Sequence, residues 1–121
     1  MRTSRHRRRS YRLGHLAELA SALTLTLKGY RILARRYRSP VGEIDLVCRR
    51  GNSLAFVEVK ARDDRGHAAK AVSPKQQARI ARAASHFLAR HPHLESCNAR
   101  FDVILVTPWR LPQHVADAWR P

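Results

Sequence analysis

The sequence predicts an α/β sandwich built around a mixed β-sheet. The first reason is the order of its hydrophobic patterns, which indicates a helix, three strands, a helix, a strand and a short helix. The second is its length of 121 residues, which suits one domain with a single hydrophobic core. The third is an apolar content of 44%, which favours a packed domain over a disordered polymer.

The N-terminal part of the chain is predicted to contain a basic arm and a helix. Residues 1–12 hold six arginines and no acidic residue, so we expect a disordered arm before a single domain over residues 13–121. Residues 13–28 are rich in Leu and Ala and stop at Gly29, a residue favoured just after a helix. This pattern predicts the first helix.

Three strands are predicted to follow this helix. Residues 30–37 alternate apolar and basic side chains, which is typical of a strand, and Ser39-Pro40 ends the pattern. Residues 42–50 and 53–61 are two further strands that flank Gly51-Asn52. This dipeptide is a two-residue hairpin signal, in which glycine supplies the positive φ of a type II′ turn.

The second half of the chain is predicted to add a helix, a strand and a short helix. After a loop over residues 63–72, Ser73-Pro74 supplies an N-cap and a first-turn proline for a helix that ends near residue 90. Residues 100–107 form the next strand, and residues 115–119 form a short last helix.

The net charge points to a polyanionic partner. The chain has 24 Lys and Arg against nine Asp and Glu, a net charge of +15. Without the six arginines of residues 1–12 the remainder still has 18 basic residues against nine acidic ones, or +9, so the domain itself is basic. Charge alone does not separate DNA from RNA or from an anionic membrane surface.

Cysteine usage and hydropathy set the expected location. Cys48 and Cys97 lie far apart without paired spacing, which indicates neither a zinc site nor a disulfide framework and favours a reducing compartment. No apolar run approaches the ~18 residues of a spanning helix. The arginine-rich start lacks the apolar stretch of a secretory signal, and an organelle transit segment is the alternative for it. The cytoplasm is expected, with no membrane partner.

The predicted hairpin brings acidic residues together. With Gly51-Asn52 as its loop, facing positions sum to 103, which sets Asp45 opposite Glu58 and Glu43 opposite Lys60. Because side chains alternate along a strand, these four share one face of the sheet. The same face is predicted to hold Val47, Leu54 and Phe56, and the opposite face Ile44, Leu46, Cys48, Ala55, Val57 and Val59.

This pair of carboxylates predicts a metal site. Like charges opposite each other destabilise a hairpin, and Lys60 can neutralise only one of them. Mg²⁺, or Mn²⁺ in its place, is held by one or two carboxylates plus substrate phosphate. In phosphodiester hydrolysis such a metal activates water, and a lysine positions that water or stabilises developing charge. The alternative is exposed strand acids bridged to basic residues, but three of only nine acids crowd this one face.

Three motifs resemble those of a known family. The chain has GEIDL at 42–46, FVEVK at 56–60 and RFDV at 100–103. In residues and spacing it resembles the YraN-like family of small bacterial proteins over residues 14–119. That family is related to the restriction-endonuclease-like superfamily with the PD-(D/E)XK motif, and is similar to archaeal Holliday junction resolvases.

The resemblance implies a fold, a site and an assembly. It implies a restriction-endonuclease-like three-layer sandwich, with a central mixed sheet flanked by helices. Asp45 and Glu58 would be metal ligands, Lys60 the catalytic lysine, and Glu18 a further metal-site carboxylate. The resolvase-like relatives act as dimers, which suggests a homodimer by analogy. The chain departs from the family pattern by having Ile44, in place of proline, before Asp45, and Arg36 where asparagine is common.

The residues themselves give two readings of Glu18. It is the only acid before Glu43, and its helical neighbours form a small, apolar surface that is unusual for a solvated face: Gly14, Ser21, Ala22 and Leu25. The alternative is an ordinary exposed helix glutamate paired with a nearby arginine. For Asp102, in an apolar strand, we expect a buried pair with Arg100 or Arg35.

The second long helix is predicted to carry a nucleic-acid-binding face. Lys75, Arg79 and Arg82 recur at spacings of four and three and form one basic stripe, opposite an apolar side. Lys75 and Gln76 open the helix, where backbone N–H groups favour a phosphate. A solvated face without a ligand is the alternative.

The predicted function is therefore a Mg²⁺-dependent endonuclease that acts on DNA, including branched or structured DNA. Asp45 and Glu58 hold the metal, Glu18 assists and Lys60 supports the nucleophile. The first alternative is a DNA- or RNA-binding protein that keeps the nuclease fold without turnover. The second is an RNA- or ribosome-associated module that binds through its basic arm.

Overall fold

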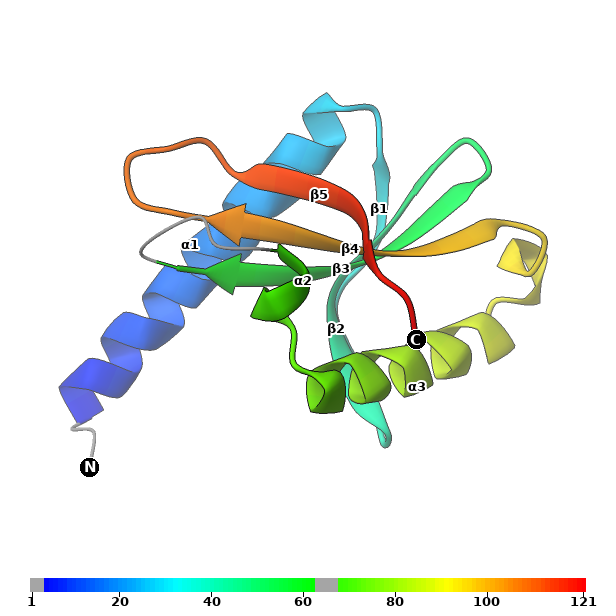
Figure 1. Cartoon of the computed structure of the whole chain (residues 1–121), viewed down its shortest axis with the longest axis horizontal. Coiled ribbons are helices and arrows are strands. Elements are labelled where there is room, and N and C mark those ends of the chain that lie inside the picture. Colours follow the sequence, from blue (N-terminus) through cyan, green and yellow to red (C-terminus); the bar gives the residue numbers. More distant parts are fainter. Residues whose placement is uncertain (1–3, 63–67) are drawn as a thin grey trace.

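The protein is a three-layer α/β sandwich with a mixed five-stranded sheet at its centre (Figure 1). A computed structural model describes residues 4–62 and 68–121. The elements in chain order are α1 (Ser4–Leu27), β1 (Arg31–Ser39), β2 (Gly42–Arg50), β3 (Ser53–Ala61), α2 (Ala68–Ala71), α3 (Pro74–Ala89), a 3₁₀ turn η1 (Pro92–Leu94), β4 (Asn98–Val106) and β5 (Gln113–Trp119).

The sheet has the order β1-β2-β3-β4-β5, so neighbours in the chain are neighbours in space. Strands β1, β2 and β3 form an antiparallel meander, and β5 lies antiparallel to β4. The β3–β4 pair is parallel, because α2 and α3 carry the chain back across the sheet. The predicted α/β sandwich with a mixed sheet is confirmed.

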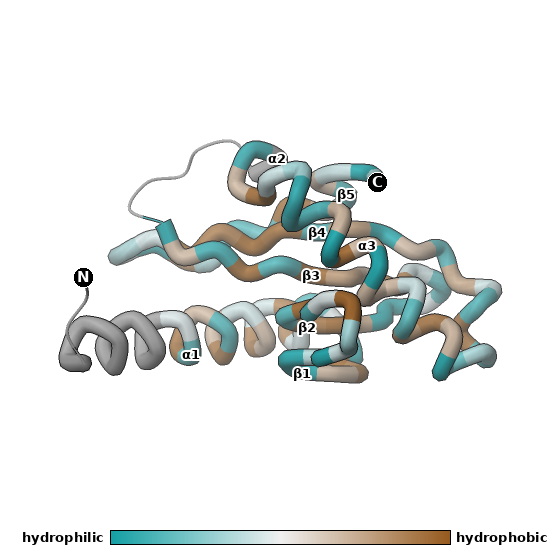
Figure 2. The backbone as a smooth tube through the Cα atoms, turned by 90° about the horizontal axis from the view of Figure 1, so that it is seen from below, coloured by the Kyte–Doolittle hydropathy of each residue, from teal (hydrophilic) through white to brown (hydrophobic). Residues whose placement is uncertain are grey.

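Each face of the sheet packs against helices through its own apolar core. On one side α3 buries Ile80, Ala83, Ala84 and Phe87 against β2, β3 and β4. On the other side α1 buries Leu25 against Leu46, Cys48, Ala55, Val57 and Ile104. Figure 2 shows the apolar residues concentrated in the middle strands, between α1 and the layer of α2 and α3.

The local signals for α3 and for the hairpin are borne out. The Ser73 hydroxyl accepts a hydrogen bond from the Gln76 amide and the Gln76 side chain accepts one from the Ser73 amide, which completes a capping box ahead of Pro74. In the hairpin, Gly51 has φ +59°, the conformation predicted for the first turn residue. Strand β4 begins two residues before the predicted position and ends one residue before it.

The prediction of a last helix over residues 115–119 is wrong, because this segment is strand β5 (Gln113–Trp119). The Asp117 amide donates a 2.9 Å hydrogen bond to Asp102 Oδ1, and the Trp119 ring stacks on Phe101 with centroids 4.4 Å apart. These contacts with β4 outweigh the local preference of an alanine-containing pentapeptide, which is too short to form a stable helix alone.

Two other boundaries differ from the sequence predictions. Helix α1 begins at Ser4, before the predicted start at residue 13, and ends at Leu27. The separate role of residues 1–12 as a basic arm stays a prediction. The predicted loop over 63–72 contains the short helix α2, while its residues 63–67 lie outside the described part of the chain.

Candidate functional site

The hairpin has the predicted register near its turn but not at the acidic residues. Backbone partners sum to 103 from Arg50–Ser53 to Leu46–Val57, where the ladder ends. Asp45 and Glu58 are therefore not ladder partners, and neither are Glu43 and Lys60. The Asp45 carboxylate instead accepts a 2.8 Å hydrogen bond from the Val59 amide, at the point where the two strands separate.

The predicted alternation of faces is also broken at Asp45. Ile44 belongs to the α3-side core, whereas Leu46 belongs to the α1-side core, so placing Ile44 with Leu46 was wrong. Strand β1 has an irregular residue at the same place: Arg36 lies between the pairs Arg35–Leu46 and Tyr37–Ile44 and has φ +52°. Because an irregularity in two paired strands rotates the side chains, the simple period of two fails here.

Asp45 and Glu58 nonetheless meet in one cavity on the α3 side. The cavity has a volume of about 150 Å³ and is lined by Glu43, Asp45, Glu58, Gln76, Arg79 and Ile80. Burial raises the pKa of Glu58 to about 8, and the charge of Asp45 adds to this rise while Lys60 opposes it. Burial also raises the pKa of Asp45, against the hydrogen bonds that it accepts from Val59 and from protonated Glu58.

Lys60 lies beside this carboxyl pair, in a fixed position. Its Nζ atom is 3.7 Å from Glu58 Oε1 and donates a 3.3 Å hydrogen bond to Gln76 Oε1. Only 17% of the Lys60 side chain is exposed. The same Gln76 oxygen accepts from the Ser73 amide, so the α3 capping box orients the lysine. The sequence placed Gln76 at a phosphate-binding helix end and did not indicate this contact.

The basic stripe of α3 borders the cavity. Lys75, Arg79 and Arg82 are exposed, opposite the buried apolar side of the helix, and Arg79 lines the cavity together with the two carboxyls. Gly42 allows this approach, because a Cβ atom there would lie 2.4 Å from the Arg79 carbonyl oxygen. Glu43 is mostly exposed and pairs weakly with Arg38 at 3.9 Å, so it adds little to the interior charge.

Glu18 lies on the α1 side of Asp45, bound to arginines. Its side chain is 8% exposed; Arg36 Nε donates to one carboxylate oxygen at 2.7 Å and Arg35 Nε to the other at 3.3 Å. Arg36 Nη2 also lies 2.6 Å from His15 Nδ1. The arginine partner that the sequence offered as an alternative is present, although the glutamate is buried. Its link to both arginines was missed, since no sequence signal marks the left-handed backbone of Arg36.

Asp45 and Glu58 have the chemistry of a metal site. Two half-buried carboxyls share a cavity, protonated Glu58 donates a hydrogen bond to Asp45, and the Lys60 ammonium lies 3.7 Å from Glu58. A divalent cation would replace that proton, and Mg²⁺ needs only one or two carboxylates beside a substrate phosphate. Within residues 4–62 and 68–121, no group of three or more His, Cys, Asp and Glu side chains could hold a metal. The candidate ligand set is therefore this pair.

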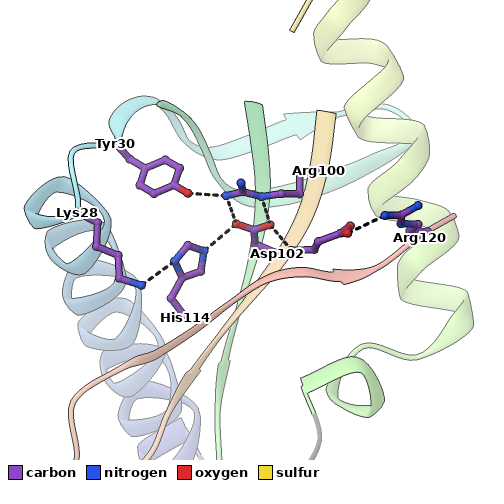
Figure 3. A network of polar contacts seen from close by, with 7 residues as sticks. Lys28, Tyr30, Arg100, Asp102, His114 and Arg120 are labelled. Carbon is purple, nitrogen blue, oxygen red and sulfur yellow. Dashed lines mark hydrogen bonds and ion pairs between the residues drawn. The ribbon is translucent and has the colours of Figure 1, made fainter. Parts of the chain in front are cut away.

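Asp102 lies in the middle of β4, paired with Val57 of β3, and belongs to a separate network of polar contacts (Figure 3). It pairs with Arg100 through two contacts of 2.9 Å, as one of the sequence alternatives proposed, and lies 2.7 Å from His114 Nε2. Lys28, after α1, reaches His114 Nδ1 at 3.1 Å. Burial raises the pKa of Asp102, but hydrogen bonds from His114, Arg100 and the Asp117 amide outweigh it and leave the pKa low. This buried ion pair links α1, β4 and β5.

The fold is an α/β sandwich consistent with the restriction-endonuclease-like fold, and sequence comparison identifies the family. The chain belongs to the Uncharacterised protein family UPF0102, whose model matches residues 17–106. This confirms the resemblance to the YraN-like proteins. The match includes Glu18, the two strands of the hairpin and all of α3, and it begins after the arginine-rich residues 1–12.

Similar proteins come from several bacteria. A UPF0102 protein of Parvibaculum lavamentivorans is 57% identical over 112 residues, which cover 93% of this chain and 84% of that protein. A UPF0102 protein of Paramagnetospirillum magneticum is 52% identical over 121 residues, which cover 97% and 94% of the two chains. One from Bradyrhizobium diazoefficiens is 53% identical, with 91% and 83% covered. Among the described residues, no helix is long and apolar enough to cross a membrane.

Proposed function

We propose that this protein is a divalent-metal-dependent endonuclease that hydrolyses phosphodiester bonds in DNA, with branched or structured DNA among its substrates. The observation that carries the proposal is the meeting of Asp45, Glu58 and Lys60 beside one cavity. A protein that only binds nucleic acid gains nothing from two carboxyls aimed at a phosphate backbone. In a chain of net charge +15, this acidic pocket within a basic surface indicates a cation between protein and phosphate.

The residues at the cavity would have different roles in hydrolysis. Asp45 and Glu58 would supply the ligating oxygens, and Mg²⁺ or Mn²⁺ bound there would activate water and neutralise charge that develops on the phosphate. Lys60 is held within reach of Glu58 by Gln76, where its ammonium group can position the attacking water or stabilise the developing charge. Arg79, on the wall of the same cavity, is placed to bind a neighbouring phosphate.

The basic stripe of α3 supports DNA as the polyanion. Lys75, Arg79 and Arg82 form an exposed row that leads from the start of the helix past the cavity. A row of cations along one helix face follows a phosphate backbone without reading bases. DNA is therefore the preferred partner over RNA in this proposal, and the substrate panel contains both.

The test is cleavage of labelled linear, forked and four-way DNA, and of single-stranded RNA, in Mg²⁺ or Mn²⁺. The variants are Glu58→Gln and Lys60→Met, which keep side-chain size but remove one carboxylate or the ammonium group. Glu95→Gln and Lys70→Met change exposed residues of the same types elsewhere and serve as matched controls.

We expect both site variants to lose cleavage by at least about 100-fold, as for removal of a group that acts in the transition state, while the controls cleave normally. A wild-type protein that binds DNA but cuts no substrate with either ion contradicts the enzyme proposal. The protein would then be a nucleic-acid-binding protein that retains the fold.

A further inference from the structure

We infer that Arg36 is a phosphate-binding residue of this site, and that Glu18 is its positioning residue in place of a metal ligand. This inference rests on the proposed function, because it names a contact for the same DNA phosphate. It also departs from what the family resemblance implies for Glu18.

Glu18 is poorly suited to hold a cation. Both of its oxygens already accept hydrogen bonds from guanidinium groups, from Arg36 at 2.7 Å and from Arg35 at 3.3 Å. A metal bound there would have to share the carboxylate with two guanidinium groups and would be repelled by their positive charges. The carboxylate is instead an anchor that fixes where the two guanidinium groups lie.

Arg36 reaches this anchor only through an unusual backbone conformation. Adjacent residues of a regular strand point to opposite faces, so Arg35 alone would reach Glu18 from β1. With φ +52°, Arg36 joins it on the same carboxylate. The left-handed region is disfavoured for residues other than Gly, Asn and Asp, and such strain concentrates at functional sites. A simple link between α1 and β1 does not require it.

The strained residue lies next to the candidate metal ligand. Arg36 lies between the two β1 residues that pair with the neighbours of Asp45, and Arg36 and Asp45 both line a second cavity, of about 260 Å³, on the α1 side. The remaining lining side chains are Gly14, His15, Ala17, Glu18, Val59 and Ala61, which are small except for His15 and Glu18. The Arg36 side chain keeps 35% of its surface exposed. The protein therefore holds the Arg36 guanidinium, through Glu18 and His15, at a cavity that Asp45 also lines.

A phosphodiester suits this arrangement. It has two non-bridging oxygens, so one can face the cation proposed at Asp45 and Glu58 while the other meets the Arg36 guanidinium. A planar guanidinium binds such an oxygen through directed, charge-assisted hydrogen bonds. Arg36 would then neutralise charge from the α1 side, while Lys60 does so from the α3 side.

The experiment measures DNA binding without cleavage. The probe is a short labelled DNA duplex titrated in Ca²⁺ over a range of salt concentrations, with Mn²⁺ binding measured separately by calorimetry. Arg36→Gly removes the guanidinium and the backbone strain together, and Arg36→Asn keeps a residue that tolerates the left-handed region. Glu18→Gln removes the anchor. Arg35→Ala, which takes the other arginine from Glu18, is the matched control.

Both Arg36 variants are expected to bind the duplex about tenfold or more weakly, with a salt slope smaller by about one. Arg35→Ala should keep the wild-type slope. Glu18→Gln should weaken DNA binding and leave the affinity for Mn²⁺ within about twofold, whereas Asp45→Asn should abolish Mn²⁺ binding.

Three results would overturn the inference. They are wild-type DNA binding by Arg36→Asn and Arg36→Gly, an equal loss of slope in Arg35→Ala, and a loss of Mn²⁺ binding in Glu18→Gln. The proposed function fails separately, if wild type cuts nothing. A loss of DNA affinity in the Arg36 variants would support the phosphate contact even then, because the titration does not depend on turnover.

Discussion

At the scale of single residues, the unfavourable electrostatic free energy of this site is concentrated in the ionisation of Glu58. Its side chain is 16% exposed, and ionising it places a second negative charge beside Asp45. The folded protein therefore retains a proton that the unfolded chain releases at ordinary pH. A cation can take the place of that proton, so the same electrostatics link stability, pH and metal binding.

The first prediction concerns the pH dependence of stability without metal. The pKa of Glu58 is raised from 4.5 to about 8, so above pH 4.5 the unfolded state ionises first and the folded state binds more protons. Stability consequently falls as pH rises from about 4.5 to 8, by up to about 1.4 kcal/mol per pH unit. Urea denaturation in a chelator at pH 5, 6, 7 and 8 measures this change.

Glu58→Gln should flatten most of that decline, because the amide does not titrate. Glu95→Gln, at an exposed position, should follow the wild-type curve. Stability that rises with pH in the wild-type protein would contradict the assigned direction.

The second prediction concerns Gly42, the first residue of the GEID motif. A Cβ atom at this position would lie 2.4 Å from the Arg79 carbonyl oxygen, which is backbone and cannot turn aside. Gly42→Ala should therefore destabilise the protein by about 1–3 kcal/mol, as for an overpacked core. Gly14→Ala is the control: its Cβ meets nothing within 4 Å, and the change should raise stability by up to about 1 kcal/mol in α1. Equal effects in both variants would contradict the assigned contact.

At the scale of secondary-structure elements, local signals predicted the hairpin and α3 well. The Gly51-Asn52 turn and the Ser73-Pro74 cap each depend on a few neighbouring residues, and the structure has both. The β5 strand was missed because its stability comes from β4, through contacts such as that of Trp119 with Phe101. A window of seven residues does not contain this information.

The candidate site, too, could be predicted from the sequence only in part. Its residue types were visible in the sequence, and Asp45, Glu58 and Lys60 do meet. The broken alternation at Asp45 was not visible, and neither was the left-handed φ of Arg36, which lies at the same place in the neighbouring strand. The bonds between Glu18 and the two arginines require α1 to be docked on β1, which sequence spacing does not specify.

The third prediction tests the link between the α3 cap and the lysine. Ser73→Ala removes the hydroxyl that caps the helix and should lower the free energy of unfolding by about 0.5–2 kcal/mol. The substitution keeps the Ser73 amide that bonds to the Gln76 side chain, but a frayed helix start should make Gln76 less ordered, loosen Lys60 and slow any cleavage. Ser85→Ala, at an exposed position within α3, should leave both unchanged. Urea denaturation and cleavage rates are measured on the same variants. A loss of stability with an unchanged cleavage rate would contradict the link.

At the scale of the whole molecule, the site lies in the sheet, with one cavity on the side of α3 and another on the side of α1. The cavity on the α3 side and the one on the α1 side share Asp45, and Arg79 lines the first cavity while Arg36 lines the second. The charge that remains after the first twelve residues is still +9. The domain is therefore expected to bind a polyanion by itself, with the arm as an addition.

The last prediction concerns how much residues 1–12 add to DNA binding. Residues 1–12 hold six arginines and precede the residues that match the family, which begin at 17. If all six neutralise DNA phosphates, deleting the segment should reduce the slope of log K against log salt by about 5, and by less if only some do. Fluorescence anisotropy with a labelled duplex between about 50 and 200 mM salt covers a range in which such a change is large.

A full-length variant with the six arginines replaced by glutamine separates charge from chain length. It should match the deletion if the arginines act through counterion release, because that effect depends on neutralised phosphates and not on the length of helix α1. An unchanged slope in both proteins would assign the binding to the domain alone. A change only in the deletion would mean that the segment acts by supporting α1, and with it the positions of Glu18 and Arg36.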